Sequence, residues 1–216
     1  NGDIVKDTST QVDPNVDEVF YMGEFVEYFE NIYIMMNKPQ GYISSTYDVD
    51  PTVVDILDDF YKTLDLSIAG RLDKDTRGLL ILSTDGNFIH KITSPNSNIE
   101  KTYEVETRDL IDESLVEEFL QGVYIAEDDY QARPAKLKII DDKKAIVKVT
   151  EGKFHLVKRL FSNLGNEVVE LKRIAIGELR LDPFLNEGDY RELNEKELAL
   201  FTNWLNEGKE VICIKI

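Results

Sequence analysis

Short strand-like segments recur along the chain without a helix after each one, and this irregular order restricts the possible folds. Alternating or apolar runs indicate strands, and apolar residues at helical spacing indicate helices. Because parallel sheets need a crossover, usually a helix, between successive strands, we expect an α+β protein with a mixed, mainly antiparallel sheet flanked by helices. The predicted strands are residues 79–83, 101–107, 137–140, 145–150, 167–171, 177–181 and 211–216. The predicted helices are residues 51–64, 87–92, 112–121 (with Asp112 as its N-cap), 155–164 and 194–206.

Composition places the chain among ordinary globular proteins. Its 216 residues, 42% hydrophobic and 31% charged, suffice for one sizeable core with a small appendage. The apolar runs are too short to span a membrane, and the single cysteine, Cys213, indicates a reducing compartment, the cytoplasm. The formal net charge of −17 argues against broad nucleic-acid binding driven by charge alone. Residues 151–180 nevertheless carry six basic against four acidic side chains, which leaves room for a cationic face.

The segment "GRLDKDTRG" places two carboxylates, Asp73 and Asp75, at the spacing of the first ligands of an EF-hand calcium loop. Arg77 stands where that loop needs a ligand oxygen, and Thr84 stands where it needs a bidentate glutamate. We therefore expect no metal here. Two interpretations of Asp73 remain open: a turn residue that caps the loop or pairs with Arg71, and a carboxylate that takes part in chemistry.

Two further segments could be structural or functional. In "EKTYEV", Lys101 and Tyr103 share one face of a predicted strand, so Tyr103 is either half-buried core or an aromatic surface for a base. In "EGKFHLVKRLF", Lys158 and Arg159 lie off the apolar helix stripe, as either a solvated basic face or a functional one. His155 is a poor candidate for a metal ligand, because the chain has only one other histidine and no nearby cysteine.

The order of four segments carries a more specific signal. They are "NKPQGYISST", "AGRLDKDTRGLLILSTDG", "ITSPNSNIEKTY" and "EGKFHLVKRLFSNLGNEVVELKRIAIG". Together they resemble the successive motifs of the ribosomal-RNA pseudouridine synthases of the RsuA type, over about residues 32–193. The resemblance implies a pseudouridine synthase catalytic domain at residues 30–216, preceded at 1–29 by the C-terminal part of an S4-like RNA-binding domain and a linker. Leu156 departs from the glutamine that the family usually has there.

What the resemblance implies is isomerisation of a uridine in structured RNA to pseudouridine, without metal or cofactor. It assigns Asp73 as the catalytic aspartate, Tyr103 as the tyrosine that stacks on the uracil, and Lys158 as the cation that pairs with Asp73. Asp75 is interpreted as structural, ordering the loop through Arg77. The candidate substrate and RNA contacts are Lys38, Arg71, Lys101, Lys153, His155, Arg159, Lys172 and Arg173.

The predicted partner is small-subunit (16S) ribosomal RNA or its assembly intermediate, because the first and third segments resemble the small-subunit enzymes more closely. The alternatives are a synthase acting on 23S ribosomal RNA and a noncatalytic RNA-binding or ribosome-assembly module. A glycosidase built on Asp73 and Asp75 is a further alternative, which requires two carboxylates facing each other about 5–10 Å apart. We also expect a monomer without membrane attachment.

Overall fold

The structure is a computed structural model that describes residues 2–7, 10–13, 16–26 and 31–205. The chain divides into two compact units, Asn1–Ile32 and Tyr33–Ile216. In the first unit, β1 (Phe20–Tyr21) and β2 (Glu24–Phe25) form an antiparallel hairpin. Its two turn residues, Met22 and Gly23, have φ angles of 54° and 89°, as a type I′ turn requires. That this unit is part of an S4-like domain stays a prediction.

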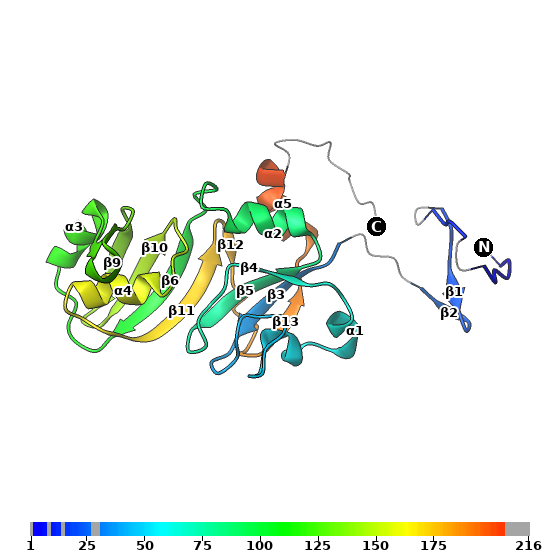
Figure 1. The fold of residues 1–216 in the computed structure, drawn as a ribbon, viewed down its shortest axis with the longest axis horizontal. Helices are drawn as coiled ribbons and strands as arrows, with labels where there is room; N and C mark the ends of the chain where they lie inside the picture. The colour runs from blue at the N-terminus through cyan, green and yellow to red at the C-terminus, as the bar shows by residue number, and fades with distance from the viewer. Residues whose placement is uncertain (1, 8–9, 14–15, 27–30, 206–216) are drawn as a thin grey trace. The chain divides into compact units, whose positions relative to one another are not determined.

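The described residues of the second unit form a nine-stranded sheet in the order β13-β3-β5-β11-β6-β10-β9, with β4 paired to β5 and β12 paired to β11 (Figure 1). Every pairing in it is antiparallel except that of β5 with β11. The predicted α+β class with a mixed, mainly antiparallel sheet is therefore confirmed. The strands are β3 (Tyr33–Lys38), β4 (Ser67–Ala69), β5 (Arg77–Ser83), β6 (Lys101–Thr107), β9 (Lys136–Asp141), β10 (Lys144–Val149), β11 (Val168–Ile176), β12 (Leu179–Arg180) and β13 (Tyr190–Glu192).

The helices form two groups on this sheet. Helices α2 (Gly86–Thr93) and α5 (Glu195–Leu205) lie together near β4 and β5, where the rings of Phe88 and Phe201 meet edge to face at 5.1 Å. Helices α3 (Ser114–Gln121) and α4 (Leu156–Asn163) lie near β9, β11 and the small hairpin of β7 (Tyr124–Ile125) and β8 (Tyr130–Gln131). The middle of the sheet lies between these two groups in Figure 1.

Three sequence predictions differ from the structure or lie outside it. The helix predicted at residues 51–64 is two short helices, η1 (Val53–Ile56) and α1 (Asp59–Lys62), because Leu57 is extended and buried between them. Asp112 is not the N-cap of α3; its carboxylate instead accepts the backbone N–H of Ser114, and the helix begins there. The strand predicted at residues 211–216 lies outside the described residues.

The structure describes no helix that is both long and apolar enough to cross a membrane. Within the same residues, no group of three or more His, Cys, Asp or Glu side chains is placed to hold a metal ion.

Gly78 permits a close backbone approach within the sheet. It pairs with Arg173 where β5 and β11 run parallel, and its φ angle is 103°. A Cβ atom at this position would lie 2.2 Å from the backbone oxygen of Arg173, which is far inside van der Waals contact. Only glycine therefore allows these two strands to pair as they do.

We expect Gly78→Ala to lower the free energy of unfolding by about 3 kcal/mol or more, since it adds both a backbone clash and a strained φ angle. Gly86→Ala is the matched control, because a Cβ at the first residue of α2 meets no atom within 4 Å. The control should stay within about 1 kcal/mol of the wild type. Urea unfolding midpoints measure both variants, and equal midpoints would contradict this account of the β5–β11 pairing.

Candidate active site

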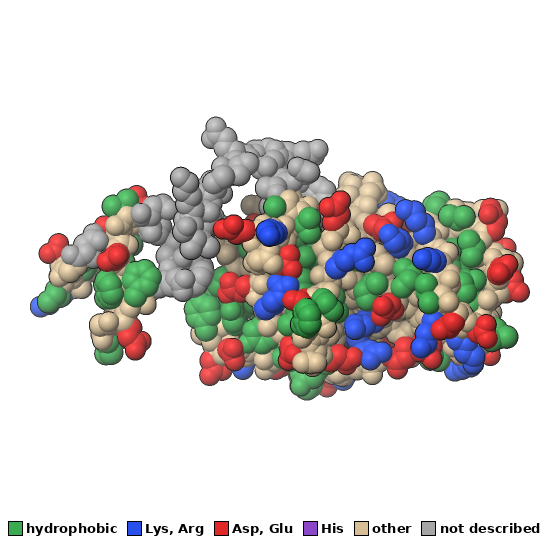
Figure 2. Space-filling view, turned by 180° about the vertical axis from the view of Figure 1, so that it is seen from behind, with side chains coloured by type: hydrophobic (Ala, Val, Ile, Leu, Met, Phe, Trp, Pro, Cys, Tyr) green, Lys and Arg blue, Asp and Glu red, His purple; other side chains and the backbone are tan. Residues whose placement is uncertain are grey.

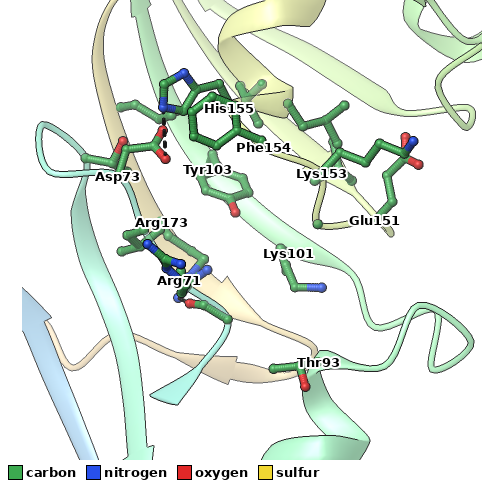
Figure 3. Close-up of a pocket in the computed structure, with 18 of the residues that line it drawn as sticks. Arg71, Asp73, Thr93, Lys101, Tyr103, Glu151, Lys153, Phe154, His155 and Arg173 are labelled. Carbon is green, nitrogen blue, oxygen red and sulfur yellow. Dashed lines mark hydrogen bonds and ion pairs between the residues drawn. The ribbon is translucent and has the colours of Figure 1, made fainter. Parts of the chain in front are cut away.

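A cavity of about 760 Å³ opens over the middle of the sheet, lined by residues of β6, β11 and the segment that leads into α4. Its volume falls within the range of roughly 300–1,000 Å³ that is typical of small-molecule sites. The loop before β5 forms one wall, strands β6 and β11 form the floor, and the segment leading into α4 forms the opposite wall (Figure 3). Its polar lining includes Arg71, Asp73, Lys101, Tyr103, Lys153, His155 and Arg173.

The loop that carries Asp73 is held from beneath by a buried lysine. The Lys38 ammonium donates hydrogen bonds to the backbone carbonyls of Asp73 and Thr76, at 3.0 and 2.9 Å. Ser44 holds the loop from the other side, since its hydroxyl donates to the carbonyl of Leu72 at 2.8 Å. Lys38 is fully buried, and this burial lowers its pKa to about 8 against the opposing charges of nearby aspartates. The prediction that Lys38 contacts RNA is therefore wrong, because its buried ammonium is hydrogen-bonded to the loop backbone.

Two cationic or ionisable groups reach the Asp73 carboxylate. His155 Nε2 lies 3.3 Å from Asp73 Oδ1, the contact that is dashed in Figure 3. Lys158 Nζ lies 3.7 Å from Asp73 Oδ2 and only 2.6 Å from Asp75 Oδ1. Lys158 therefore lies near Asp73, as predicted, but its shorter contact is with Asp75.

The interpretation that Asp75 orders its loop through Arg77 is wrong. Arg77 pairs with Glu170 and Glu187 instead, each at 2.8 Å. Burial alone would raise the pKa of the Asp75 carboxyl, but the hydrogen bond and positive charge of Lys158 outweigh burial and hold that pKa below its usual value. Both carboxylates of the loop approach the same ammonium, so they do not face each other across a cleft as a glycosidase pair would.

His155 occupies a strained position beside Asp73. Its φ and ψ angles of 50° and 27° are left-handed, a conformation that costs of order 1–3 kcal/mol for a residue other than glycine. Its ring stacks on Phe154 at a centroid distance of 3.6 Å and an interplanar angle of 20°. The Phe154 side chain is 74% exposed at the cavity wall, where it presents an aromatic surface. Sequence reasoning missed Phe154, although an aromatic residue off the α4 apolar stripe was a usable signal.

The cavity floor carries positive charge without compensating carboxylates. Lys101 and Tyr103 rise from β6, and Arg173 comes from the neighbouring β11. Arg173 is buried and donates to the backbone carbonyls of Leu79 and Gly70, both at 2.8 Å. In the described part of the chain, no acidic side chain pairs with Arg71, Lys101 or Arg173. Because burying a cation without an acidic partner is costly, the buried Lys101 and Arg173 suit an anionic ligand.

Two of the predicted RNA contacts lie away from the cavity, and a third stays in its lining. Arg159 points to η2 (Ala126–Asp128), where it lies 2.7 Å from an Asp128 carboxylate oxygen, so it is not at the cavity. Lys172 precedes Arg173 in β11 and, because strand side chains alternate, lies on the opposite face of the sheet. Lys153 stays in the lining, with its ammonium 3.5 Å from the centroid of the Tyr130 ring. Apolar periodicity in the sequence predicts which side chains point away from the core. It does not predict which basic residue pairs with which acidic residue.

Comparison with known proteins agrees with this architecture. A sequence model described as RNA pseudouridylate synthase matches residues 32–170. "Uncharacterized RNA pseudouridine synthase YtzG" of Bacillus subtilis is 45% identical over 205 residues, covering 93% of this chain and 85% of that protein. "Ribosomal small subunit pseudouridine synthase A" of Haemophilus influenzae is 41% identical, covering 92% of this chain and 85% of that protein. The Escherichia coli (strain K12) protein of the same name is 39% identical, covering 92% and 86%.

A solved structure extends the agreement to three dimensions. It is described as "Crystal structure of pseudouridylate synthase" and superposes with a TM-score of 0.76 at 40% identity, covering 92% of this chain and 86% of that chain. The fold is therefore that of an RNA pseudouridine synthase. More narrowly, the chain belongs to the RsuA-type family of these enzymes, and it is an isomerase that acts on uridine in RNA.

We expect the buried charge of Lys101 to lower the stability of the folded protein. Burial, together with the nearby positive charge of Arg173, lowers the pKa of Lys101 from 10.5 to about 8. The unfolded chain therefore binds more protons than the folded protein between these two pH values, so the free energy of unfolding rises with pH across this window. Below about pH 8 the folded protein carries the full cost.

We expect Lys101→Met to be more stable than the wild type at pH 7, by on the order of 2 kcal/mol, because it removes a buried unpaired charge. The difference should shrink as the pH rises from about 8 to 10.5. Urea unfolding of both proteins over this pH range measures it. A difference that stays constant from pH 7 to 10.5 would contradict the assignment of the cost to the Lys101 charge.

Proposed function

We propose that the protein converts a uridine of 16S ribosomal RNA to pseudouridine, with Asp73 as the carboxylate that reacts with the substrate. The observation that supports this most is the position of Asp73 at the cavity wall. There it has His155 and Lys158 within 4 Å, and it faces the same cavity as Tyr103. Figure 3 shows Asp73 and His155 to one side of Tyr103 and Lys101 to the other.

The reaction needs a carboxylate, a surface for the base and positive charge for the RNA. The N-glycosidic bond of the uridine breaks, the uracil turns, and C5 bonds to C1′ of the ribose. C5 then loses its proton and N1 gains one, so atoms and electrons balance. Asp73 either adds to the sugar or ring and departs again, or acts as a base. The Lys158 ammonium, 3.7 Å away, places a positive charge beside the carboxylate on which both routes depend.

The substrate base must leave its stack before it reaches Asp73, at a cost of a few kcal/mol. Tyr103 supplies an aromatic face against which the flipped uracil stacks, and its hydroxyl end supports transfer of the C5 proton. The unpaired cations Arg71, Lys101 and Arg173 attract the RNA to the same cavity, and Lys153 adds charge at its wall. The set Asp73, Tyr103 and Lys158 around one site favours catalysis over a noncatalytic RNA-binding module.

The support for a small-subunit target is the similarity of the whole chain to proteins of that name. The Haemophilus influenzae and Escherichia coli small-subunit enzymes are 41% and 39% identical to it over 92% of its length. Large-subunit RNA remains the alternative target and is an outcome of the test below.

Asp73→Asn should abolish pseudouridine formation while folding and RNA affinity stay close to wild type, because the amide keeps the shape but neither attacks nor accepts a proton. Release of tritium from C5-labelled uridine in the RNA measures turnover. Asp50→Asn is the matched control, since Asp50 is also an aspartate paired with a lysine, Lys74 at 2.7 Å, but does not line the cavity. Turnover by Asp73→Asn above a small fraction of the wild-type rate would refute the role of Asp73.

The target is tested by incubating purified protein separately with 16S RNA, small-subunit assembly intermediates and 23S RNA, and then mapping pseudouridine. We expect a single modified uridine in the small-subunit RNA. Modification of 23S RNA alone would move the assignment to the large subunit. An inactive protein that still binds these RNAs would favour the noncatalytic module.

A further inference from the structure

Lys158 lies between two carboxylates and contacts them unequally. Its ammonium nitrogen is 2.6 Å from Asp75 Oδ1, a hydrogen-bonding distance, and 3.7 Å from Asp73 Oδ2. At 3.7 Å the charge of Lys158 still acts on Asp73, but this distance is too long for a hydrogen bond between the two groups. Lys158 therefore lies closer to Asp75 than to Asp73.

Asp75 is separate from the contacts that hold its loop. The loop is anchored by the buried Lys38 ammonium and by the paired hydrogen bonds between Ser44 and the backbone of Leu72. The Asp75 side chain is 70% exposed and directs its carboxylate at Lys158. Replacing that carboxylate by an amide therefore changes the partner of Lys158 without removing a loop anchor.

The other charged groups around this pair have partners of their own. His155 approaches the opposite Asp73 oxygen, and Lys74 is paired with Asp50. Among the described residues, Asp73 is the other carboxylate within 4 Å of Lys158. Lys158 released from Asp75 would therefore close onto Asp73, and a carboxylate whose lone pairs are held by an ammonium is a poorer nucleophile and base.

We propose that Asp75 is a positioning residue: it holds Lys158 beside Asp73 while preventing Lys158 from forming a full ion pair with it. The inference rests on the proposed function, in which Asp73 reacts with the substrate. Asp75 touches neither the base nor the sugar in this scheme and acts only through Lys158. Asp75, the second carboxylate of "GRLDKDTRG", thus has a role distinct from that of Asp73.

Asp75→Asn tests the proposal through the division between kcat and KM. We expect kcat to fall by about tenfold or more, because a displacement of about 1 Å in a catalytic group has effects of that size. KM for the RNA should not rise, since the change removes a negative charge near the substrate. Asp50→Asn removes the carboxylate of the neighbouring lysine pair and should keep the wild-type kcat. An unchanged kcat in Asp75→Asn would overturn the proposal.

A double-mutant cycle separates positioning of Lys158 from any general effect on the loop. In a Lys158→Met background, Asp75→Asn should change kcat by less than about twofold, because the residue through which it acts is gone. Equal fold-losses in the two backgrounds would show that Asp75 acts independently of Lys158 and would overturn the proposal.

A crystal structure of Asp75→Asn provides a readout that does not depend on residual activity. We expect the Lys158 ammonium to move from 3.7 Å to hydrogen-bonding distance of Asp73 Oδ2, and an unmoved ammonium would overturn the proposal. Asp73→Asn distinguishes the two levels of the argument. If it stays active, the proposed function fails; if it is inactive while Asp75→Asn matches the wild type, only the positioning role fails.

Discussion

The parallel contact between β5 and β11 is the interaction on which the rest of the structure depends. It joins two antiparallel groups of strands into one sheet and sets the loop before β5 beside residues that lie about a hundred positions later in the sequence. Arg173 strengthens the joint, because its guanidinium donates to backbone carbonyls on both sides of that loop, Leu79 and Gly70. The wall and floor of the cavity thus share one set of backbone hydrogen bonds. The pairing of β5 with β11 therefore determines where the loop that carries Asp73 lies.

An acidic chain can act on RNA here because its acidic residues pair with basic side chains outside the cavity. Figure 2 shows basic and acidic side chains intermixed over one face of the molecule. Outside the cavity, carboxylates neutralise several of the basic side chains, as Asp128 does for Arg159 and Glu170 does for Arg77. Inside it, Arg71, Lys101 and Arg173 have no acidic partner among the described residues. A net charge of −17 therefore coexists with a local positive field, which is the quantity that a phosphate backbone senses.

Sequence reasoning reached the fold class and the residues around the cavity because both depend on periodicity and on a specific order of motifs. The strand at residues 101–107 and the buried stripe of α4 match the structure closely. It was wrong about pairings that long-range geometry decides. Lys38 is a basic residue next to a rigid turn, but only the folded loop shows that its ammonium is enclosed by carbonyls. The partner of Asp75 lies 83 residues away, whereas the predicted partner was two residues away.

The exposed ring of Phe154 has a thermodynamic consequence for RNA binding. Most contacts around the cavity are ionic, so association is expected to weaken with salt. An RNA that covers this ring also removes apolar surface from water, and burial of apolar surface lowers the heat capacity of the complex. The enthalpy of binding then becomes more favourable with temperature, and a plot of the logarithm of affinity against reciprocal temperature is curved. We therefore expect RNA binding at this ionic cavity to have a hydrophobic component that comes from Phe154.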